Sequence, residues 1–152
     1  MKPQCPALAI LVALIASPLW ADDAVFLNPG QLIWQAAPPT LPKGAKLAVL
    51  RGDPAKSGPF TIRLSVPAGY KVPPHRHSRA ESVTVISGSF HLGLGDRIDK
   101  AKAHELKAGG YRYLPAEVHH YAVARTRGVI QIEGEGPFDI HYLDPADKPE
   151  GK

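Results

Sequence analysis

Residues 69–88, which read GYKVPPHRHSRAESVTVISG, constrain the fold of this chain more than any other stretch. His75 and His77 stand two residues apart, and Glu81 follows four residues after His77. Side chains alternate along a strand, so two histidines at this spacing face the same side of an extended backbone. The stretch therefore brings two imidazoles together, and a bend after His77 can return the carboxylate of Glu81 to the same point.

Imidazole nitrogen and carboxylate oxygen indicate a particular kind of site. These ligands suit iron, manganese, nickel, copper and zinc, and three of them facing one point can hold a first-row divalent ion. We therefore expect one divalent metal ion at residues 75–81, and the sequence leaves its identity open among these five metals. The alternative is that both histidines are solvent-facing residues of a proline-rich loop.

A second group of residues, Gly109, Pro115 and His120, has a spacing that complements the first. Together the two stretches resemble the two motifs of the cupin family. Residues 69–88 match the first motif, G(X)5HXH(X)3–4E(X)6G, at every fixed position, and residues 109–124 follow the second, G(X)5PXG(X)2H(X)3N. Glu117 replaces the glycine of the second motif, and Ala124 replaces its asparagine.

The resemblance implies an all-β fold, a double-stranded β-helix or jelly-roll barrel, with a metal inside it. The metal ligands that it implies are His75, His77, Glu81 and His120. Three neutral imidazoles and one carboxylate would leave a divalent ion with a net positive charge and open coordination positions. Such a centre would attract an anionic oxygen ligand, such as an enolate or a carboxylate, and would allow Lewis-acid polarisation or dioxygen activation.

We expect a small organic molecule to bind at this metal, and two functions remain open. The first is a dioxygenase-type or related metal-dependent enzyme. The second is a non-catalytic module that binds or senses a small molecule or the metal itself, as cupin domains attached to anti-sigma factors do. A purely structural cupin is disfavoured by the complete ligand set, and the fold does not decide because one scaffold hosts many chemistries.

The first 21 residues have the order of a secretory signal peptide. Lys2 precedes the apolar run of residues 7–16, and the small residue Ala21 is followed by two acidic residues. The run is short for a membrane helix, which needs about 20 residues, and a retained anchor is the alternative. We expect cleavage after Ala21, a periplasmic or secreted protein without membrane attachment, and a single domain at residues 22–152.

Cysteine usage and charge limit the other partners. The only cysteine, Cys5, would leave with the signal peptide, so the domain would have neither a disulfide nor a thiolate ligand. The net charge of +4 is carried by scattered basic residues, which disfavours a nucleic-acid partner. The resemblance implies a homodimer, since small single cupins commonly pair by their sheets.

Short segments of alternating apolar and polar residues indicate a sandwich or barrel. The expected strands are residues 32–35, 46–50, 60–66, 82–86, 90–94, 119–124, 129–132 and 138–142. The Ser-Gly-Ser sequence at residues 87–89 predicts a hairpin between two of them. We expect a polar loop at residues 95–104 and a loose, charged tail from about residue 145.

Several histidines and tyrosines outside the metal set have two interpretations. A lone histidine in a strand is usually a surface or hydrogen-bonded residue, and we expect this of His91, His104 and His141. Tyr111 and Tyr113 flank the second motif, where one of them could line a pocket. As strand aromatics they are at least as well suited to the core.

Strand alternation also separates the remaining polar residues near the motifs. Arg63, Arg76 and Arg79 could meet an anionic substrate, but Arg76 lies between two inward histidines and is expected to face outward. His119 is expected to face away from the metal for the same reason. Glu117 could be an extra carboxylate near the metal, but we interpret it as an exposed turn residue that replaces a glycine.

Overall fold

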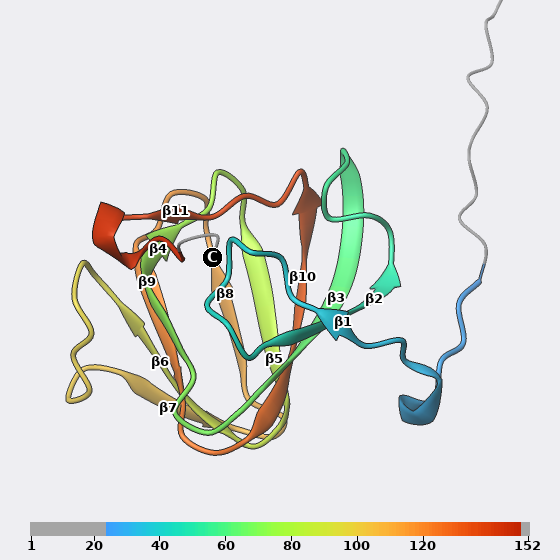
Figure 1. Ribbon diagram of the computed structural model, residues 1–152, viewed down its shortest axis with the longest axis horizontal. Coiled ribbons are helices and arrows are strands. Elements are labelled where there is room, and N and C mark those ends of the chain that lie inside the picture. The colour runs from blue at the N-terminus through green and yellow to red at the C-terminus, as the bar shows by residue number, and fades with distance from the viewer. Residues whose placement is uncertain (1–23, 150–152) are drawn as a thin grey trace, which may run out of the picture.

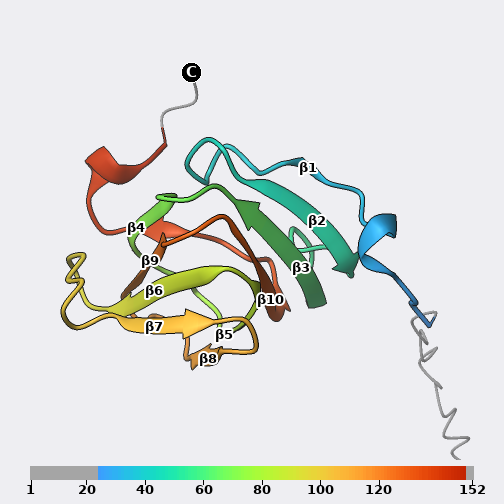
Figure 2. The ribbon, with the colours of Figure 1, turned by 90° about the horizontal axis from the view of Figure 1, so that it is seen from below.

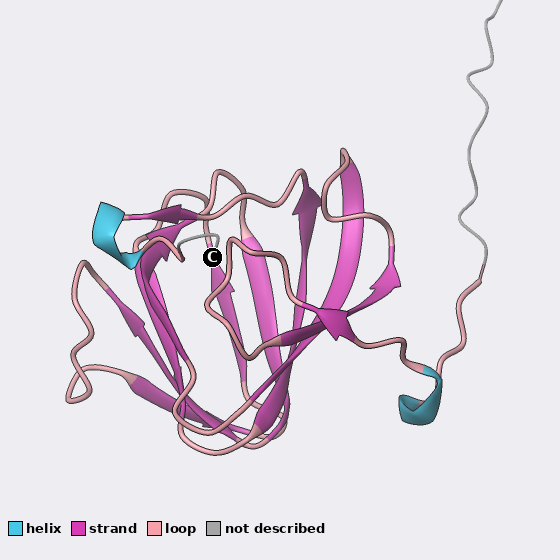
Figure 3. Cartoon of the chain, viewed as in Figure 1, coloured by secondary structure: helices cyan, strands magenta, loops and turns pink. Residues whose placement is uncertain are grey.

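The computed structural model describes residues 24–149, which form two antiparallel β-sheets with short connections (Figures 1 and 3). The larger sheet contains, in spatial order, β1 (Gln35–Ala36), β2 (Lys46–Arg51), β3 (Gly58–Val66), β10 (Gly128–Gly136), β5 (Glu81–Ser87) and β8 (Tyr111–Leu114). The smaller sheet contains β11 (His141–Tyr142), β4 (Lys71–Arg76), β9 (His120–Ala124), β6 (Ser89–Leu94) and β7 (His104–Lys107). Two 3₁₀ turns, η1 (Pro29–Gln31) and η2 (Pro145–Asp147), lie near the two ends of this region.

The two sheets face each other and enclose the core, as the view from below shows (Figure 2). Apolar residues alternate along β3, where Phe60, Ile62 and Leu64 are buried and their neighbours are partly exposed. β10 lies beside β3 and places Ile132 opposite Ile62 and Ile130 opposite Leu64. Alternation on both strands therefore gives the larger sheet one continuous aliphatic inner face.

This architecture confirms the expected all-β jelly roll. The segments expected at residues 46–50, 60–66, 82–86 and 90–94 lie inside strands β2, β3, β5 and β6. The strand expected at residues 32–35 was placed too early, because β1 begins at Gln35. The start of the expected loose tail forms the turn η2, which is capped by the side chain of Asp144.

The expected hairpin at residues 87–89 is wrong. β5 pairs with β10 and β8 in the larger sheet, whereas β6 pairs with β9 and β7 in the smaller one. Gly88 therefore turns the chain from one sheet into the other. It has a φ of +80°, and a Cβ atom there would lie 2.6 Å from the carbonyl oxygen of Arg127, so only glycine fits this corner.

The strand expected at residues 138–142 is also largely wrong. Only its last two residues form β11, and residues 138–140 cross one end of the barrel without pairing to a strand. The amide of Phe138 donates to the carbonyl of Pro54, and its ring lies 5.0 Å from the ring of Phe60. Contacts with the interior, and not hydrogen bonds to a neighbouring strand, therefore hold this segment.

The proposed signal peptide, residues 1–21, lies outside the described residues. Among residues 24–149, no helix combines the length and the apolar character needed to cross a bilayer.

Candidate metal centre

Three of the four residues that the sequence singled out lie on strands, and the fourth follows directly after a strand. His75 lies on β4, and His77 follows one residue after β4 ends. Glu81 is the first residue of β5, and His120 is the first residue of β9. β4 and β9 are paired so that His75 stands directly opposite His120, and cross-strand partners are within side-chain contact.

Three of these residues form one compact cluster. His75, His77 and His120 are all buried, and each offers a ligand atom within 4.8 Å of those of the other two. The ring centroids of His75 and His120 are 4.1 Å apart, and those of His75 and His77 are 4.9 Å apart. Three imidazoles at this spacing could hold a metal ion.

Backbone carbonyls set the orientation of all three imidazoles. His75 Nδ1 donates to the carbonyl of Pro73 at 2.7 Å, and His120 Nδ1 donates to the carbonyl of Val118 at 2.8 Å. His77 Nδ1 donates to the carbonyl of Asp139. A carbonyl can only accept, so each Nδ1 carries the hydrogen and each Nε2 keeps a free lone pair. This is how proteins orient histidines that bind a metal.

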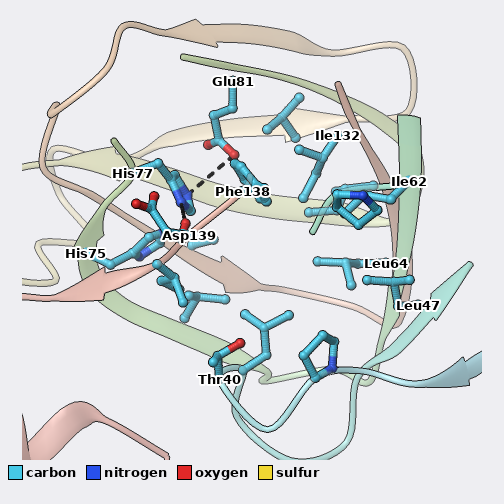
Figure 4. A pocket seen from close by; sticks show the side chains of 18 of the residues that line it. Thr40, Leu47, Ile62, Leu64, His75, His77, Glu81, Ile132, Phe138 and Asp139 are labelled. Atoms are coloured by element: carbon cyan, nitrogen blue, oxygen red, sulfur yellow. Dashed lines mark hydrogen bonds and ion pairs between the residues drawn. The ribbon is translucent and has the colours of Figure 1, made fainter. Parts of the chain in front are cut away.

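Glu81 lies beside two of these lone pairs. One carboxylate oxygen, Oε1, is 3.3 Å from His120 Nε2. The other, Oε2, is 3.6 Å from His77 Nε2, and Figure 4 shows this contact. Within residues 24–149, the buried Nε2 of His120 has no hydrogen-bond partner. A lone pair that faces a carboxylate is repelled unless a cation lies between them, so this donor set fits a metal ion.

The buried environment favours the protonation states that a metal requires. Burial lowers the pKa of His75 to about 3, and the charges of His120 and His77 add to this effect. Burial also lowers the pKa of His77, although the charge of Glu81 opposes it. Burial acts to raise the pKa of Glu81, but the close approach of His120 and the charge of Arg112 outweigh this and lower it to about 2. Neutral imidazoles beside an ionised carboxylate are ready to bind a metal.

Arg112 is a site residue that the sequence analysis missed. It lies on β8, its side chain is only 15% exposed, and Nη2 donates to Glu81 Oε1 at 3.0 Å. Strand alternation could have found it, because Arg112 and the buried Leu114 occupy the same face of β8. The flanking Tyr111 and Tyr113, considered for the pocket or the core, are instead each 58% exposed.

The other arginines considered for an anionic substrate lie away from the histidines. Arg63 donates to Gln131 on the outer side of the larger sheet, and Arg79 is exposed. Arg76 forms an ion pair with Glu117, as expected for an outward residue. Glu117 is exposed and has a φ of +66°, so it adopts the left-handed conformation at the position where the motif has glycine.

His119 and three further histidines lie outside the cluster. His119 Nδ1 is 2.7 Å from Asp96 Oδ1, and its side chain is 40% exposed, so the register of the second motif is the expected one. His141 Nε2 is 2.9 Å from Asp139 Oδ2. His91 is partly buried on β6 and His104 is exposed on β7.

A cavity of about 300 Å³ adjoins the cluster. His75, His77, Glu81 and Arg112 line it, and its walls come from both sheets, from the loops at residues 38–41 and 54–55 and from the segment at residues 138–140. Figure 4 shows the labelled polar side chains of His75, His77 and Glu81 away from Ile62, Leu64 and Leu47. The cavity is therefore polar beside the imidazoles and aliphatic elsewhere.

The jelly-roll barrel and its cluster of inward histidines give this protein the fold of the cupins and a candidate metal centre. Residues 18–141 match the family described as a domain of unknown function, DUF4437, and the chain belongs to that family. No curated protein matches the chain.

Solved structures show the same fold at low sequence identity. The polyketide cyclase RemF from Streptomyces resistomycificus is 15% identical, with a TM-score of 0.69 over 84% of this chain and 90% of that chain. A candidate acetylacetone dioxygenase from Methylibium petroleiphilum PM1 is 19% identical, with a TM-score of 0.64 over 85% of this chain and 87% of that chain. An RmlC-like cupin from Shewanella frigidimarina NCIMB 400 is 19% identical, with a TM-score of 0.59 over 74% and 91%.

Proposed function

We propose that this protein holds one divalent metal ion in the barrel and acts as a metal-dependent enzyme, of the dioxygenase type or related to it, on a small organic molecule. The observation that carries the proposal is the orientation of the three histidines. Every Nδ1 is committed to a backbone carbonyl, and Nε2 of His77 and of His120 lies beside the carboxylate of Glu81. The two lone pairs and the carboxylate repel each other, and a cation in the centre would turn this repulsion into attraction.

In this proposal His75, His77, His120 and Glu81 hold the metal, which supplies Lewis-acid polarisation or dioxygen activation when bound. Arg112 holds the carboxylate of Glu81 by donating to Oε1. The ring of Phe138 stacks on His77, with centroids 4.3 Å apart, and shields that side of the cluster. The aliphatic walls exclude water and leave the substrate room beside the metal.

The cavity favours a protein that takes up a small molecule over a sensor of the metal alone. A sensor of the metal alone needs no space beside its ligands, whereas about 300 Å³ adjoins this cluster. Two of the similar structures are described as enzymes, a polyketide cyclase and a candidate dioxygenase, which supports catalysis without choosing the reaction. A module that binds a small molecule without turning it over is the second candidate, because the same cavity would serve it.

The test is to prepare the metal-free protein and load it separately with iron, manganese, nickel, copper and zinc. Oxygen consumption and product formation are then followed over a panel of phenols, enediols and small acids. Turnover by one metal form, lost in His120→Ala, would support the enzyme. Metal-dependent ligand binding without turnover by any form would favour the binding module, and a protein that binds none of the metals would contradict both.

A further inference from the structure

We infer that the cavity selects a small molecule with one anionic oxygen head and an apolar body, against neutral and polyhydroxylated molecules of the same length. This inference rests on the proposed function, since the head would lie at the metal. It names the class of ligand, which the proposed function leaves open. It follows from the distribution of polarity, from the charge of the site and from the volume of the cavity.

The distribution of polarity requires an apolar body. Away from the histidines, the cavity is lined by aliphatic side chains, among them Leu47, Ile62, Leu64, Val83, Ile130 and Ile132. A hydroxyl group placed against this wall would lose its hydrogen bonds to water without gaining a partner. A sugar-like molecule carries such groups along its whole length, so the wall disfavours it.

The remaining polar side chains do not change this conclusion. Thr40 and Asp139 also line the cavity. Asp139 is bound by other residues, because its two carboxylate oxygens accept from Ser78 and one of them lies 2.9 Å from His141. Thr40 is drawn away from His77 and Glu81 in Figure 4, and it adds one hydroxyl group to a largely apolar lining.

The charge of the site requires an anionic head. Arg112 and Glu81 form a buried ion pair, with side chains 15% and 4% exposed, and their charges cancel. The three imidazoles are neutral when they bind a metal, so the carboxylate of Asp139 is the lining group left to offset a divalent ion, and a net positive charge would remain. A low-dielectric surrounding makes such an uncompensated charge costly. One anionic oxygen from the ligand supplies the missing compensation, and a neutral alcohol does not.

The volume limits the length of the body. The cavity of about 300 Å³ lies at the small end of ligand pockets. It has room for about ten water-sized groups at roughly 30 Å³ each. A second charged group at the far end of such a molecule would meet the aliphatic wall, so dianions are disfavoured as well.

A series of six-carbon molecules isolates these features. Hexanoate has the anionic head and the apolar body, hexan-1-ol lacks the charge, gluconate adds hydroxyl groups, and adipate adds a second carboxylate. Binding of each to the Zn²⁺-loaded protein is measured by calorimetry, after a Zn²⁺ titration of the metal-free protein. We expect hexanoate to bind at least tenfold more tightly than each of the other three.

Substitutions of a lining residue test whether hexanoate binds inside the cavity. Ala122 lines it from β9, and Ala122→Leu fills part of the space, so hexanoate affinity should fall at least tenfold while Zn²⁺ affinity stays unchanged. Ala122→Val is the milder variant and should show a smaller loss in the same direction. The control is Ala101→Leu, which adds the same atoms at an exposed loop position and should change neither affinity.

The two proposals fail in different ways. A protein that binds no Zn²⁺ contradicts the metal centre, and this inference falls with it. A protein that binds Zn²⁺ but takes gluconate or hexan-1-ol as tightly as hexanoate contradicts only the ligand class. Hexanoate binding that survives both Ala122 substitutions unchanged would place the ligand outside the cavity and would also overturn the inference.

Discussion

Arg112 reaches from β8 to Glu81 and donates from Nη2 to Oε1 at 3.0 Å, which joins two buried and oppositely charged side chains beside the histidine cluster. Removal of one partner of such a pair leaves the other charge uncompensated. The pair therefore links the stability of the barrel to the charge of the centre. Comparison of the unfolding free energy with and without metal tests this link.

Arg112→Met should destabilise the metal-free protein by about 3 kcal/mol, because the carboxylate of Glu81 loses its buried counter-charge. Loading with Zn²⁺ should recover part of this loss, since the metal offers Glu81 another positive charge. Urea unfolding with and without Zn²⁺ measures both effects. Arg63→Met is the matched control on the outer side of the larger sheet, where Arg63 donates to Gln131, and it should cost less than about 1 kcal/mol.

His120→Ala should abolish tight metal binding, and His119→Ala should leave most of it. The two side chains are neighbours in sequence, but His120 lies in the buried cluster whereas His119 pairs with Asp96 at the surface. Titration of both metal-free variants with Zn²⁺, followed by calorimetry, compares them directly. Loss of binding in His119→Ala with retention in His120→Ala would contradict the proposed ligand set.

The metal-free protein should lose stability as the pH falls from about 6.5 toward 3. An unfolded histidine has a pKa of about 6.5, and burial lowers the pKa of His75 in the folded protein to about 3. Between these values the unfolded chain binds a proton that the folded chain does not, so acidification favours unfolding. Glu81, with its pKa lowered to about 2, acts in the same direction at lower pH.

Urea unfolding at several values between pH 7.5 and pH 4 measures this dependence, and His75→Gln should make it shallower. Stability that rises as the pH is lowered through this range would contradict the burial of neutral imidazoles. Metal affinity should be less sensitive to pH than at an exposed histidine site, because burial lowers the pKa of His75 to about 3 and protons then compete weakly with the metal for its Nε2.

Position 117 should tolerate glycine better than a branched residue. Glu117 has a φ of +66° and is exposed, and a β-branched side chain is strongly disfavoured in that conformation. Glu117→Val should destabilise the protein by about 1–3 kcal/mol, whereas Glu117→Gly should stay within about 1 kcal/mol of the parent. Both variants lose the ion pair with Arg76, so their comparison by thermal unfolding isolates the backbone effect.

The chain isolated from its native cell should begin at Asp22. The motivation is the order of Lys2, the apolar run of residues 7–16 and Ala21. Intact-mass spectrometry of the native protein, with fractionation of the cells, decides the matter. Recovery of a chain that still carries residues 1–21, in the membrane fraction, would instead support a retained anchor.

The sequence predicted the histidines of the centre better than their surroundings. His75, His77 and His120 could be predicted from the sequence, because strand alternation and motif spacing are local properties of the chain. The same rule predicts an inward Arg112, since it shares a face of β8 with the buried Leu114. Its partner Glu81 lies 31 residues away, so only the pairing of β5 with β8 identifies the ion pair.

The errors in the fold have a similar physical origin. A glycine turn between two apolar strands looks the same whether the strands pair or enter different sheets. Here β5 pairs with β10 and β6 pairs with β9, and both of these partners lie much later in the chain. Residues 138–140 alternate like a strand, but long-range contacts of Phe138 with Pro54 and His77 hold them in another conformation. Tertiary contacts of this kind override a local pattern.

The groups that accept from the three Nδ1 atoms are all main-chain carbonyls, those of Pro73, Val118 and Asp139. Every amino acid has such a carbonyl, so substitution at these positions can change the side chain without removing the acceptor. The direction in which each imidazole points is therefore set by the course of the backbone. Divergent members of the family can keep the same donor geometry while sharing none of the residues that support it, and comparison of side chains alone would overlook that support.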